Sequence, residues 1–159
     1  MVRYVNGNIL SELDDSQHIF ICQQVNCQGV MGAGLAKQIR AKWPVVFTEY
    51  KSLCDKNYQK YQLGDCQVVE VDKKICIANI FGQLNYGTDK RYTSYFAISL
   101  GFHKLFNNYW TPSGRQDLIF RIPYGFGCGL GGGDWDVVSS IIEDAAYQYD
   151  MNVEIWKLP

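Results

Sequence analysis

The segment IFICQQVNCQGVMGAGLAKQIRAKW, residues 19–43, places a strand, a glycine-rich turn and a helix in direct succession. Ile19 to Val25 have the composition of a strand, because β-branched and other apolar residues predominate there. From Ala33 to Trp43 the apolar residues recur three and four positions apart, which predicts a helix with one buried stripe. The residues between them, Gln28 to Gly34, form the glycine-rich turn. This order is that of one strand-to-helix unit in an α/β fold.

A second unit of the same kind lies near the end of the chain. Leu118 to Ile122 predict a strand, and Pro123 to Gly133 form a glycine-dense loop. A helix follows, for which Asp134 is a suitable N-cap. Its apolar stripe comprises Val138, Ile141, Ile142, Ala145 and Tyr149. Because ligands of such sheets bind beyond the carboxyl ends of the strands, both glycine loops are expected at the same edge.

The remaining segments alternate in the same manner. Asp72-Lys73-Lys74 separates two β-rich runs and predicts a hairpin. Pro44 suits the first turn of a short helix. The further predicted strands are 1–5, 66–71, 75–80 and 153–156, and the further helices are 44–53 and 95–109. The sequence therefore predicts one domain over residues 1–159, a three-layer α/β/α sandwich around a mixed central sheet.

Composition narrows the classes of function. The 159 residues carry 15 basic and 16 acidic side chains, a formal net charge of −1, so we expect no extended nucleic-acid surface. No run approaches the roughly 18 apolar residues of a membrane span, and the sequence after Met1 does not have the pattern of a signal peptide. We therefore expect a cytoplasmic, monomeric protein that does not associate with a membrane.

Cysteine usage gives no sign of a metal or redox centre. The six cysteines form no CxxC pair, and only His18 and His103 accompany them. Most lie in apolar or strand-like runs, where a reduced cysteine acts as a small hydrophobic residue. We expect free structural thiols, with no metal and no cofactor.

The two glycine loops carry the chemistry. Glycine allows a positive φ and close approach of a ligand, and the free N–H groups at a helix start favour an anion such as phosphate. Either loop alone is also compatible with a plain tight turn. The chain has no GxxxxGK[ST] motif, and the acidic residue that a dinucleotide site needs, Glu49, falls in a predicted helix. Hydride transfer with NAD is therefore the weaker alternative.

Three motifs together resemble the macrodomains, a family that binds ADP-ribose. Val5-Asn-Gly-Asn-Ile-Leu10 is similar to the opening element of that family. Val25-Asn-Cys-Gln-Gly-Val-Met-Gly-Ala-Gly34 resembles the segment after its second core strand, and Pro123 to Gly133, followed by Asp134-Trp135, resembles its phosphate-binding loop. The stretch from Phe81 to Tyr95 most resembles phage and bacterial members described as ADP-ribose-1''-phosphate phosphatases.

The resemblance implies a role for each matched position. Asn8 and Ile9 would contact the adenine, Asn26 the distal ribose, and the backbone of the two loops the diphosphate. Tyr124 or Phe126 would cover a ribose or base, or instead anchor its loop. The full set of implied ligand-binding residues is Asn8, Ile9, Asn26, Gln28, Gly29, Val30, Met31, Gly32, Ala33, Gly34, Tyr124, Gly125, Phe126, Gly127, Cys128, Gly129 and Leu130.

Several positions depart from the family pattern. Most macrodomains carry Asp where this chain has Asn8, and some phosphatase relatives carry His where it has Gln23, which is not a general base at neutral pH. The lysine that glycohydrolase relatives use has no counterpart near Phe81. The candidates left for catalysis are Asn26 and Gln23, which would position a water molecule, and Asp134, which would activate water or cap its helix.

Three functions follow as hypotheses. The first is an enzyme that hydrolyses ADP-ribose-1''-phosphate to ADP-ribose and phosphate, slowly, because it works by orientation without a strong base. The second is a non-catalytic module that binds ADP-ribose. The third is a hydrolase of ADP-ribosyl or O-acyl-ADP-ribose esters.

Overall fold

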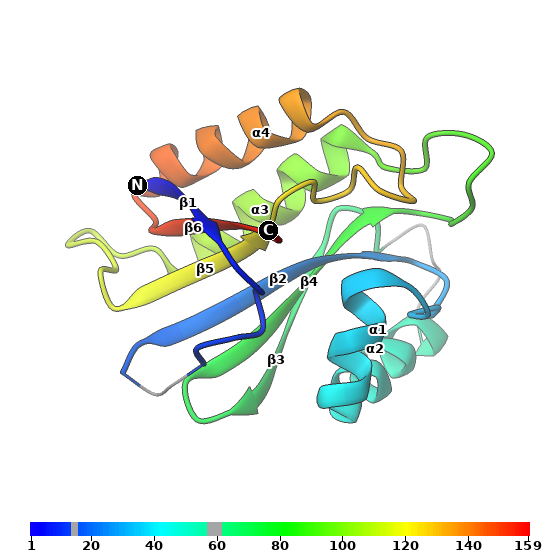
Figure 1. Cartoon of the computed structure of the whole chain (residues 1–159), viewed down its shortest axis with the longest axis horizontal. Helices are drawn as coiled ribbons and strands as arrows, with labels where there is room; N and C mark the ends of the chain where they lie inside the picture. The colour runs from blue at the N-terminus through cyan, green and yellow to red at the C-terminus, as the bar shows by residue number, and fades with distance from the viewer. Residues whose placement is uncertain (14–15, 57–61) are drawn as a thin grey trace.

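A six-stranded mixed sheet forms the centre of the structure, a computed structural model that describes residues 1–13, 16–56 and 62–159 (Figure 1). The strand order is β1-β6-β5-β2-β4-β3, and each described pairing is parallel except the antiparallel pair β3–β4. The strands are β1 (Val2–Asn6), β2 (His18–Asn26), β3 (Cys66–Asp72), β4 (Ile75–Gln83), β5 (Leu118–Pro123) and β6 (Val153–Lys157).

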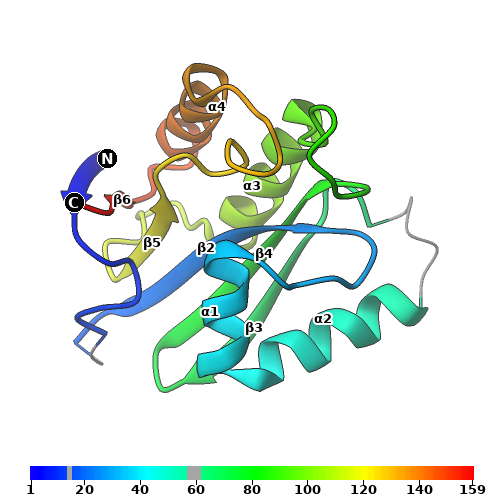
Figure 2. The same cartoon turned by 45° about the vertical axis from the view of Figure 1, so that its right-hand side comes forward.

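Two helices cover each face of the sheet (Figure 2). One pair is α1 (Gly34–Lys42) and α2 (Pro44–Lys56), and the other is α3 (Tyr95–Tyr109) and α4 (Trp135–Gln148). Two separate hydrophobic cores result. Along β2, Phe20 packs in the core under α3 and α4, whereas the next residue, Ile21, packs in the core under α1 and α2, as the two-residue period of a strand requires. The predicted three-layer sandwich is confirmed.

Most element boundaries agree with the sequence-based predictions. The helix over 95–109, the helix start at Pro44 and the β3–β4 hairpin are all confirmed. The end of β4 differs, because the strand continues to Gln83 and not only to Ile80. Phe81 is fully buried and pairs with Val25 of β2, so both packing and hydrogen bonding extend the strand. The following loop is correspondingly shorter than predicted.

Three further features of the described residues bear on the expectations drawn from composition. None of their helices is long and apolar enough to cross a membrane. The six cysteines are free thiols, and burial raises the pKa of Cys27 to about 12 and that of Cys66 and Cys76 to about 11 each. In the described part of the chain, no three His, Cys, Asp or Glu side chains are grouped so that they could hold a metal ion.

Candidate functional site

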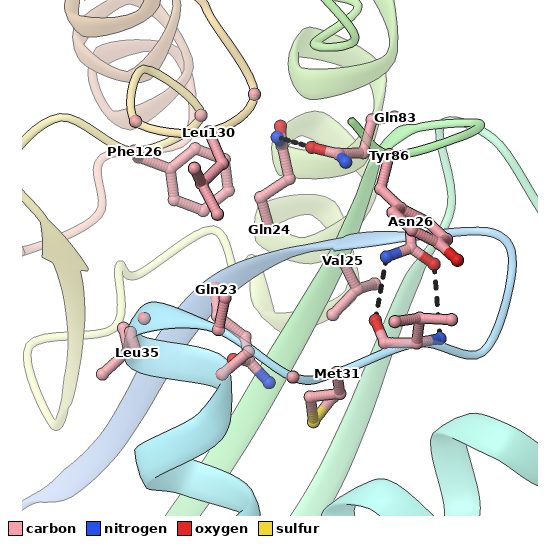
Figure 3. Close-up of a pocket in the computed structure, with 18 of the residues that line it drawn as sticks. Gln23, Gln24, Val25, Asn26, Met31, Leu35, Gln83, Tyr86, Phe126 and Leu130 are labelled. Atoms are coloured by element: carbon pink, nitrogen blue, oxygen red, sulfur yellow. Dashed lines mark hydrogen bonds between the residues drawn. The ribbon is translucent and has the colours of Figure 1, made fainter. Parts of the chain in front are cut away.

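A cavity of about 580 Å³ lies between the two glycine loops, at the carboxyl ends of the parallel neighbours β2 and β5 (Figure 3). The predicted position of both loops at one sheet edge is confirmed. The wall of the cavity comprises Gln23, Gln24, Val25, Asn26, Val30, Met31, Gly32, Ala33, Gly34, Leu35, Ala36, Gln83, Tyr86, Gly87, Thr88, Pro123, Gly125, Phe126, Gly127, Gly129, Leu130 and Gly131. None of these residues is acidic, basic or histidine, so the wall that the structure describes carries no charged side chain.

The first loop places the start of α1 at the wall of this cavity. The N-cap residue, Ala33, makes no capping hydrogen bond, whereas Ser94 and Asp134 cap α3 and α4 with their side chains. Within the described residues, the N–H groups of Gly34, Leu35 and Ala36 donate no hydrogen bond. The cavity wall therefore includes unpaired donors and the positive end of a helix dipole.

The second loop presents a similar set of donors. The N–H groups of Phe126 and Cys128 each donate to the carbonyl oxygen three residues earlier, that of Pro123 at 3.0 Å and that of Gly125 at 2.8 Å. Those of Gly125, Gly127 and Gly129 donate no hydrogen bond to any described residue. Every second N–H group along this stretch is thus available to a ligand, as an anion-binding loop requires.

Asn26 shapes the first loop with its side chain. Its Oδ1 accepts from the N–H of Gln28 at 2.9 Å and of Val30 at 3.4 Å, and its Nδ2 donates to the carbonyl oxygen of Val30 at 2.8 Å. Figure 3 shows the two bonds to Val30. One proton of Nδ2 has no partner among the described residues.

A polar network that the sequence did not indicate supports the second loop. Gln24 Nε2 donates to Gln83 Oε1 at 2.6 Å and to Thr93 Oγ1 at 2.9 Å (Figure 3 shows the first bond). Thr93 in turn donates to the carbonyl oxygen of Gly127 at 2.7 Å. Gln24 and Thr93 thereby join the end of β2 to the end of β4 and to the second glycine loop.

Glycine is required around the amide group of Gln24. A Cβ atom at Gly82 would lie 2.2 Å from Gln24 Oε1, and one at Gly127 would lie 3.1 Å from it. Gly127 also has a φ of +72°, which side chains rarely adopt. Two of the glycines near the cavity thus make room for the glutamine, in addition to any contact with a ligand.

The structure brings most of the predicted site residues to the cavity. Twelve of them line it: Gln23, Asn26, Val30, Met31, Gly32, Ala33, Gly34, Gly125, Phe126, Gly127, Gly129 and Leu130. The others, which do not line it, are Asn8, Ile9, Gln28, Gly29, Tyr124, Cys128 and Asp134. Gln24, Gln83, Tyr86 and Thr88 line the cavity without having been predicted, and no local motif distinguishes them.

The predicted adenine contacts lie in a turn beside β6. Asn8 is exposed, and its Oδ1 accepts from the N–H of Leu10 at 2.9 Å. Ile9 is buried, and its carbonyl oxygen accepts from Arg121 Nη1 at 3.1 Å. The roles of Asn8 and Ile9 in binding a base remain predictions.

The two aromatic residues of the second loop differ in environment. Phe126 is buried and lies 5.2 Å from the ring of Phe102, which agrees with the alternative that it anchors the loop. Tyr124 is 42% exposed and packs against Trp135, with ring centres 4.8 Å apart. Lys157 Nζ also lies 4.6 Å from the ring centre of Tyr124. Tyr124 is therefore the more exposed of the two residues, but it has neighbours on its ring.

Asp134 is an exposed N-cap. Its Oδ1 accepts from the N–H of Asp136 at 2.9 Å, and its own N–H donates to the hydroxyl oxygen of Tyr95 at 2.9 Å. The predicted capping role is confirmed. Its predicted catalytic role remains a prediction, and its position away from the cavity wall gives that role no support.

Comparison with proteins of known sequence identifies relatives among enzymes of ADP-ribose chemistry. Over 85 residues, 52% of this chain, it is 32% identical to the ADP-ribose 1''-phosphate phosphatase of Scheffersomyces stipitis, of which it covers 49%. Over 158 residues, 93% of this chain, it is 25% identical to the DNA ADP-ribosyl glycohydrolase of Mycobacterium tuberculosis, of which it covers 39%. The chain thus matches about half or less of each of these two enzymes.

A third relative matches from end to end. An uncharacterized 17.5 kDa protein of Enterobacteria phage T4 is 23% identical over 163 residues, which are 99% of this chain and 97% of the phage protein. No family model matches the chain.

Solved structures share the fold over almost the whole chain. A protein of unknown function from Bacteroides thetaiotaomicron superposes with a TM-score of 0.84 at 22% identity, covering 99% of this chain and 98% of that one. The macrodomain of Mycobacterium tuberculosis DarG superposes with a TM-score of 0.78 at 25% identity, covering 98% and 97% of the two chains.

One solved neighbour contains a ligand. Thermosipho africanus DarTG in complex with ADP-ribose superposes with a TM-score of 0.69 at 23% identity, covering 90% of this chain and 38% of that one. Together, the shared fold and the sequence similarity to these proteins show that the chain belongs to the macrodomain family.

Proposed function

We propose that this chain binds ADP-ribose, with the diphosphate held between the two glycine loops. The observation that carries the proposal is a pair of N–H sets without partners among the described residues, on opposite sides of one cavity: those of residues 34–36, and those of Gly125, Gly127 and Gly129. Backbone N–H groups and a helix N-terminus bind a diphosphate without cationic side chains. The net charge of −1 is consistent with such a site.

The reaction that we propose is hydrolysis of ADP-ribose-1''-phosphate. Water attacks the terminal phosphorus atom, the bond from phosphorus to the 1''-oxygen breaks, and that oxygen takes a proton, which gives ADP-ribose and inorganic phosphate. Gln23 and Asn26 would orient the water, and unpaired N–H groups would stabilise the charge that develops on the phosphate. The similarity to the Scheffersomyces stipitis phosphatase supports this choice.

A non-catalytic ADP-ribose module is the second candidate. The observation in its favour is the absence of any acidic, basic or histidine side chain from the described cavity wall. Asn and Gln amides can bind ribose hydroxyls, but they do not act as general bases at neutral pH. Hydrolysis of ADP-ribosyl or O-acyl-ADP-ribose esters would use the same binding site, with water attacking a carbon atom in place of phosphorus.

Two measurements on the wild-type protein decide among these candidates. Titration calorimetry with ADP-ribose tests binding, and a colorimetric assay of phosphate released from ADP-ribose-1''-phosphate tests the reaction. Binding with phosphate release is the expected result. Binding without phosphate release would favour the non-catalytic module or the ester hydrolase. Product analysis with O-acetyl-ADP-ribose would then distinguish these two. No binding of ADP-ribose would overturn the proposal as a whole.

A further inference from the structure

Three buried or half-buried amide side chains form a continuous chain away from the cavity. Gln23 Nε2 donates to Asn79 Oδ1 at 2.7 Å, and Asn79 Nδ2 donates to Gln67 Oε1 at 3.1 Å. Gln67 Nε2 then donates to the carbonyl oxygen of Glu49, on α2, at 3.2 Å. The three residues are cross-strand neighbours on β2, β4 and β3, so the chain crosses the sheet at one level.

The last link fixes the direction of every hydrogen bond before it. The carbonyl oxygen of Glu49 can only accept, so Gln67 must direct its Nε2 toward it and its Oε1 toward Asn79. Asn79 must then donate with Nδ2, which leaves its Oδ1 for Gln23. Gln23 must therefore donate with Nε2 as well. The orientation of these three amide groups follows from the network.

The cavity end of this chain has one unused group. Gln23 lines the cavity and is only 2% exposed, and its Oε1 is buried without a hydrogen-bond partner among the described residues. A buried acceptor without a partner costs free energy that a donor recovers. Since Gln23 cannot rotate its amide without breaking the chain, its Oε1 stays at this position as an acceptor.

We propose that Gln23 Oε1 accepts a hydrogen bond from a neutral O–H group in the cavity, and that Asn79 and Gln67 are positioning residues that keep it an acceptor. This inference rests on the proposed function and adds the chemistry of one subsite. The diphosphate of ADP-ribose is ionised at neutral pH, so its oxygens have no proton to donate and are repelled by the amide oxygen. The group at this subsite is therefore a ribose hydroxyl or the attacking water, whereas the phosphates lie on the backbone N–H groups.

Variants that remove single links test the assignment. Q23M keeps the length of the side chain and removes the amide, Q67M breaks the chain outside the cavity, and Q148M is the matched control on the exposed end of α4. If the O–H group is a ribose hydroxyl, Q23M binds ADP-ribose about tenfold more weakly, or about 1.4 kcal/mol, and binds ADP as the wild type does. If it is the attacking water, both affinities persist and phosphate release falls about tenfold.

Q67M distinguishes positioning from structural support. Q67M is expected to lower the same quantity as Q23M, ADP-ribose affinity or phosphate release, by a smaller factor. Its melting temperature should also fall below that of Q148M, because Asn79 Nδ2 is buried and loses its acceptor. The KM-against-kcat pattern shared with Q23M is therefore the readout that a merely structural role would not produce. A wild type that binds ADP-ribose, together with a Q23M variant unchanged in affinity and phosphate release, would overturn the inference. A wild type that does not bind ADP-ribose instead overturns the proposed function.

The fixed direction of the chain can be tested without any ligand. In Q23E burial raises the pKa of the new carboxyl group, and Asn79 Oδ1, which cannot turn away, raises that pKa further. The stability of Q23E relative to the wild type is then greatest at pH 5 and decreases as the pH rises to 8. The double variant Q23E/Q67M lets Asn79 turn its Nδ2 toward the carboxylate and should show a smaller decrease relative to Q67M. Equal decreases in the two backgrounds would show that Gln67 does not fix the direction of Asn79, and the inference would fail.

Discussion

The hydroxyl oxygen of Tyr50, on α2, lies 2.6 Å from the carbonyl oxygen of Asn26 and 2.9 Å from its Oδ1. Tyr50 is fully buried, and burial raises the pKa of its hydroxyl group, which therefore remains a donor. The same Asn26 side chain closes the first glycine loop on Val30. Tyr50, in the α2 layer, thus fixes Asn26, the residue at which the first glycine loop starts.

The variant Y50F should weaken both the fold and the loop. It removes one buried hydrogen bond and leaves the carbonyl oxygen of Asn26 with one partner fewer, so we expect the free energy of unfolding to decrease by about 1–2 kcal/mol. We also expect weaker ADP-ribose binding, because Asn26 gains freedom. Urea denaturation and calorimetry measure the two effects. Y50F with unchanged affinity would show that Asn26 holds the loop without help from α2.

Asp134 allows a direct choice between its two predicted roles. As the N-cap of α4, outside the cavity wall, it should affect stability alone. We expect D134A to lower the free energy of unfolding by about 1 kcal/mol and to retain phosphate release and ADP-ribose affinity. D134S restores a capping hydroxyl and serves as the control. Loss of phosphate release in both D134A and D134S would instead establish a catalytic carboxylate.

Thr93 is the test of the network beneath the second loop. T93V keeps the shape of the buried side chain but removes the hydroxyl that joins Gln24 to the carbonyl oxygen of Gly127. We expect ADP-ribose affinity to fall about tenfold, because the loop loses its link to β2, and stability to fall by about 1–2 kcal/mol. T93S retains the hydroxyl and should bind as the wild type does. Equal affinities of T93V and T93S would exclude the network from ligand binding.

The sequence predicted the layers and the position of the site because those depend on local patterns. The apolar residues of α3 recur at helical spacing, and the glycine-rich turns around Gly34 and Gly125 mark where a strand ends and a helix begins. The structure has these elements where the sequence places them. The extension of β4 to Gln83 was missed because it depends on pairing of Phe81 with β2.

The internal support of the site was not predictable in the same way. Gln24 and Thr93 are 69 residues apart in sequence, and Gln23 and Asn79 are 56 apart. No period or motif joins such pairs, since the sheet order alone makes them neighbours. The sequence also assigned Asn26 to the ligand, and only the structure shows that most of its hydrogen bonds are made within its own loop.

Stability should depend on pH mainly above pH 8. Burial raises the pKa of Cys27 to about 12 and of Cys66 and Cys76 to about 11, whereas a free cysteine titrates near 8.5. These raised values mean that the unfolded chain loses thiol protons first, so the contribution to stability is full below about pH 8 and is lost as the pH rises. Melting temperatures between pH 7 and pH 10 measure this, and a C66A variant should show a shallower decline. A flat profile over that range would contradict the buried, protonated state of the thiols.

Gly129 is a position where a charge can be placed in the cavity with little disturbance of the fold. A Cβ atom there meets nothing within 4 Å, in contrast to Gly127, where a positive φ and the Gln24 amide oppose any side chain. We expect G129E to bind ADP-ribose at least about a hundredfold more weakly, or about 2.7 kcal/mol, because its carboxylate competes with the diphosphate for unpaired N–H groups. G129Q has the same size without the charge and should lose less affinity. Similar melting temperatures of the two variants, measured beside their calorimetric titrations, would assign the difference to charge. Equal affinities of G129E and G129Q would mean that no phosphate lies against the second loop.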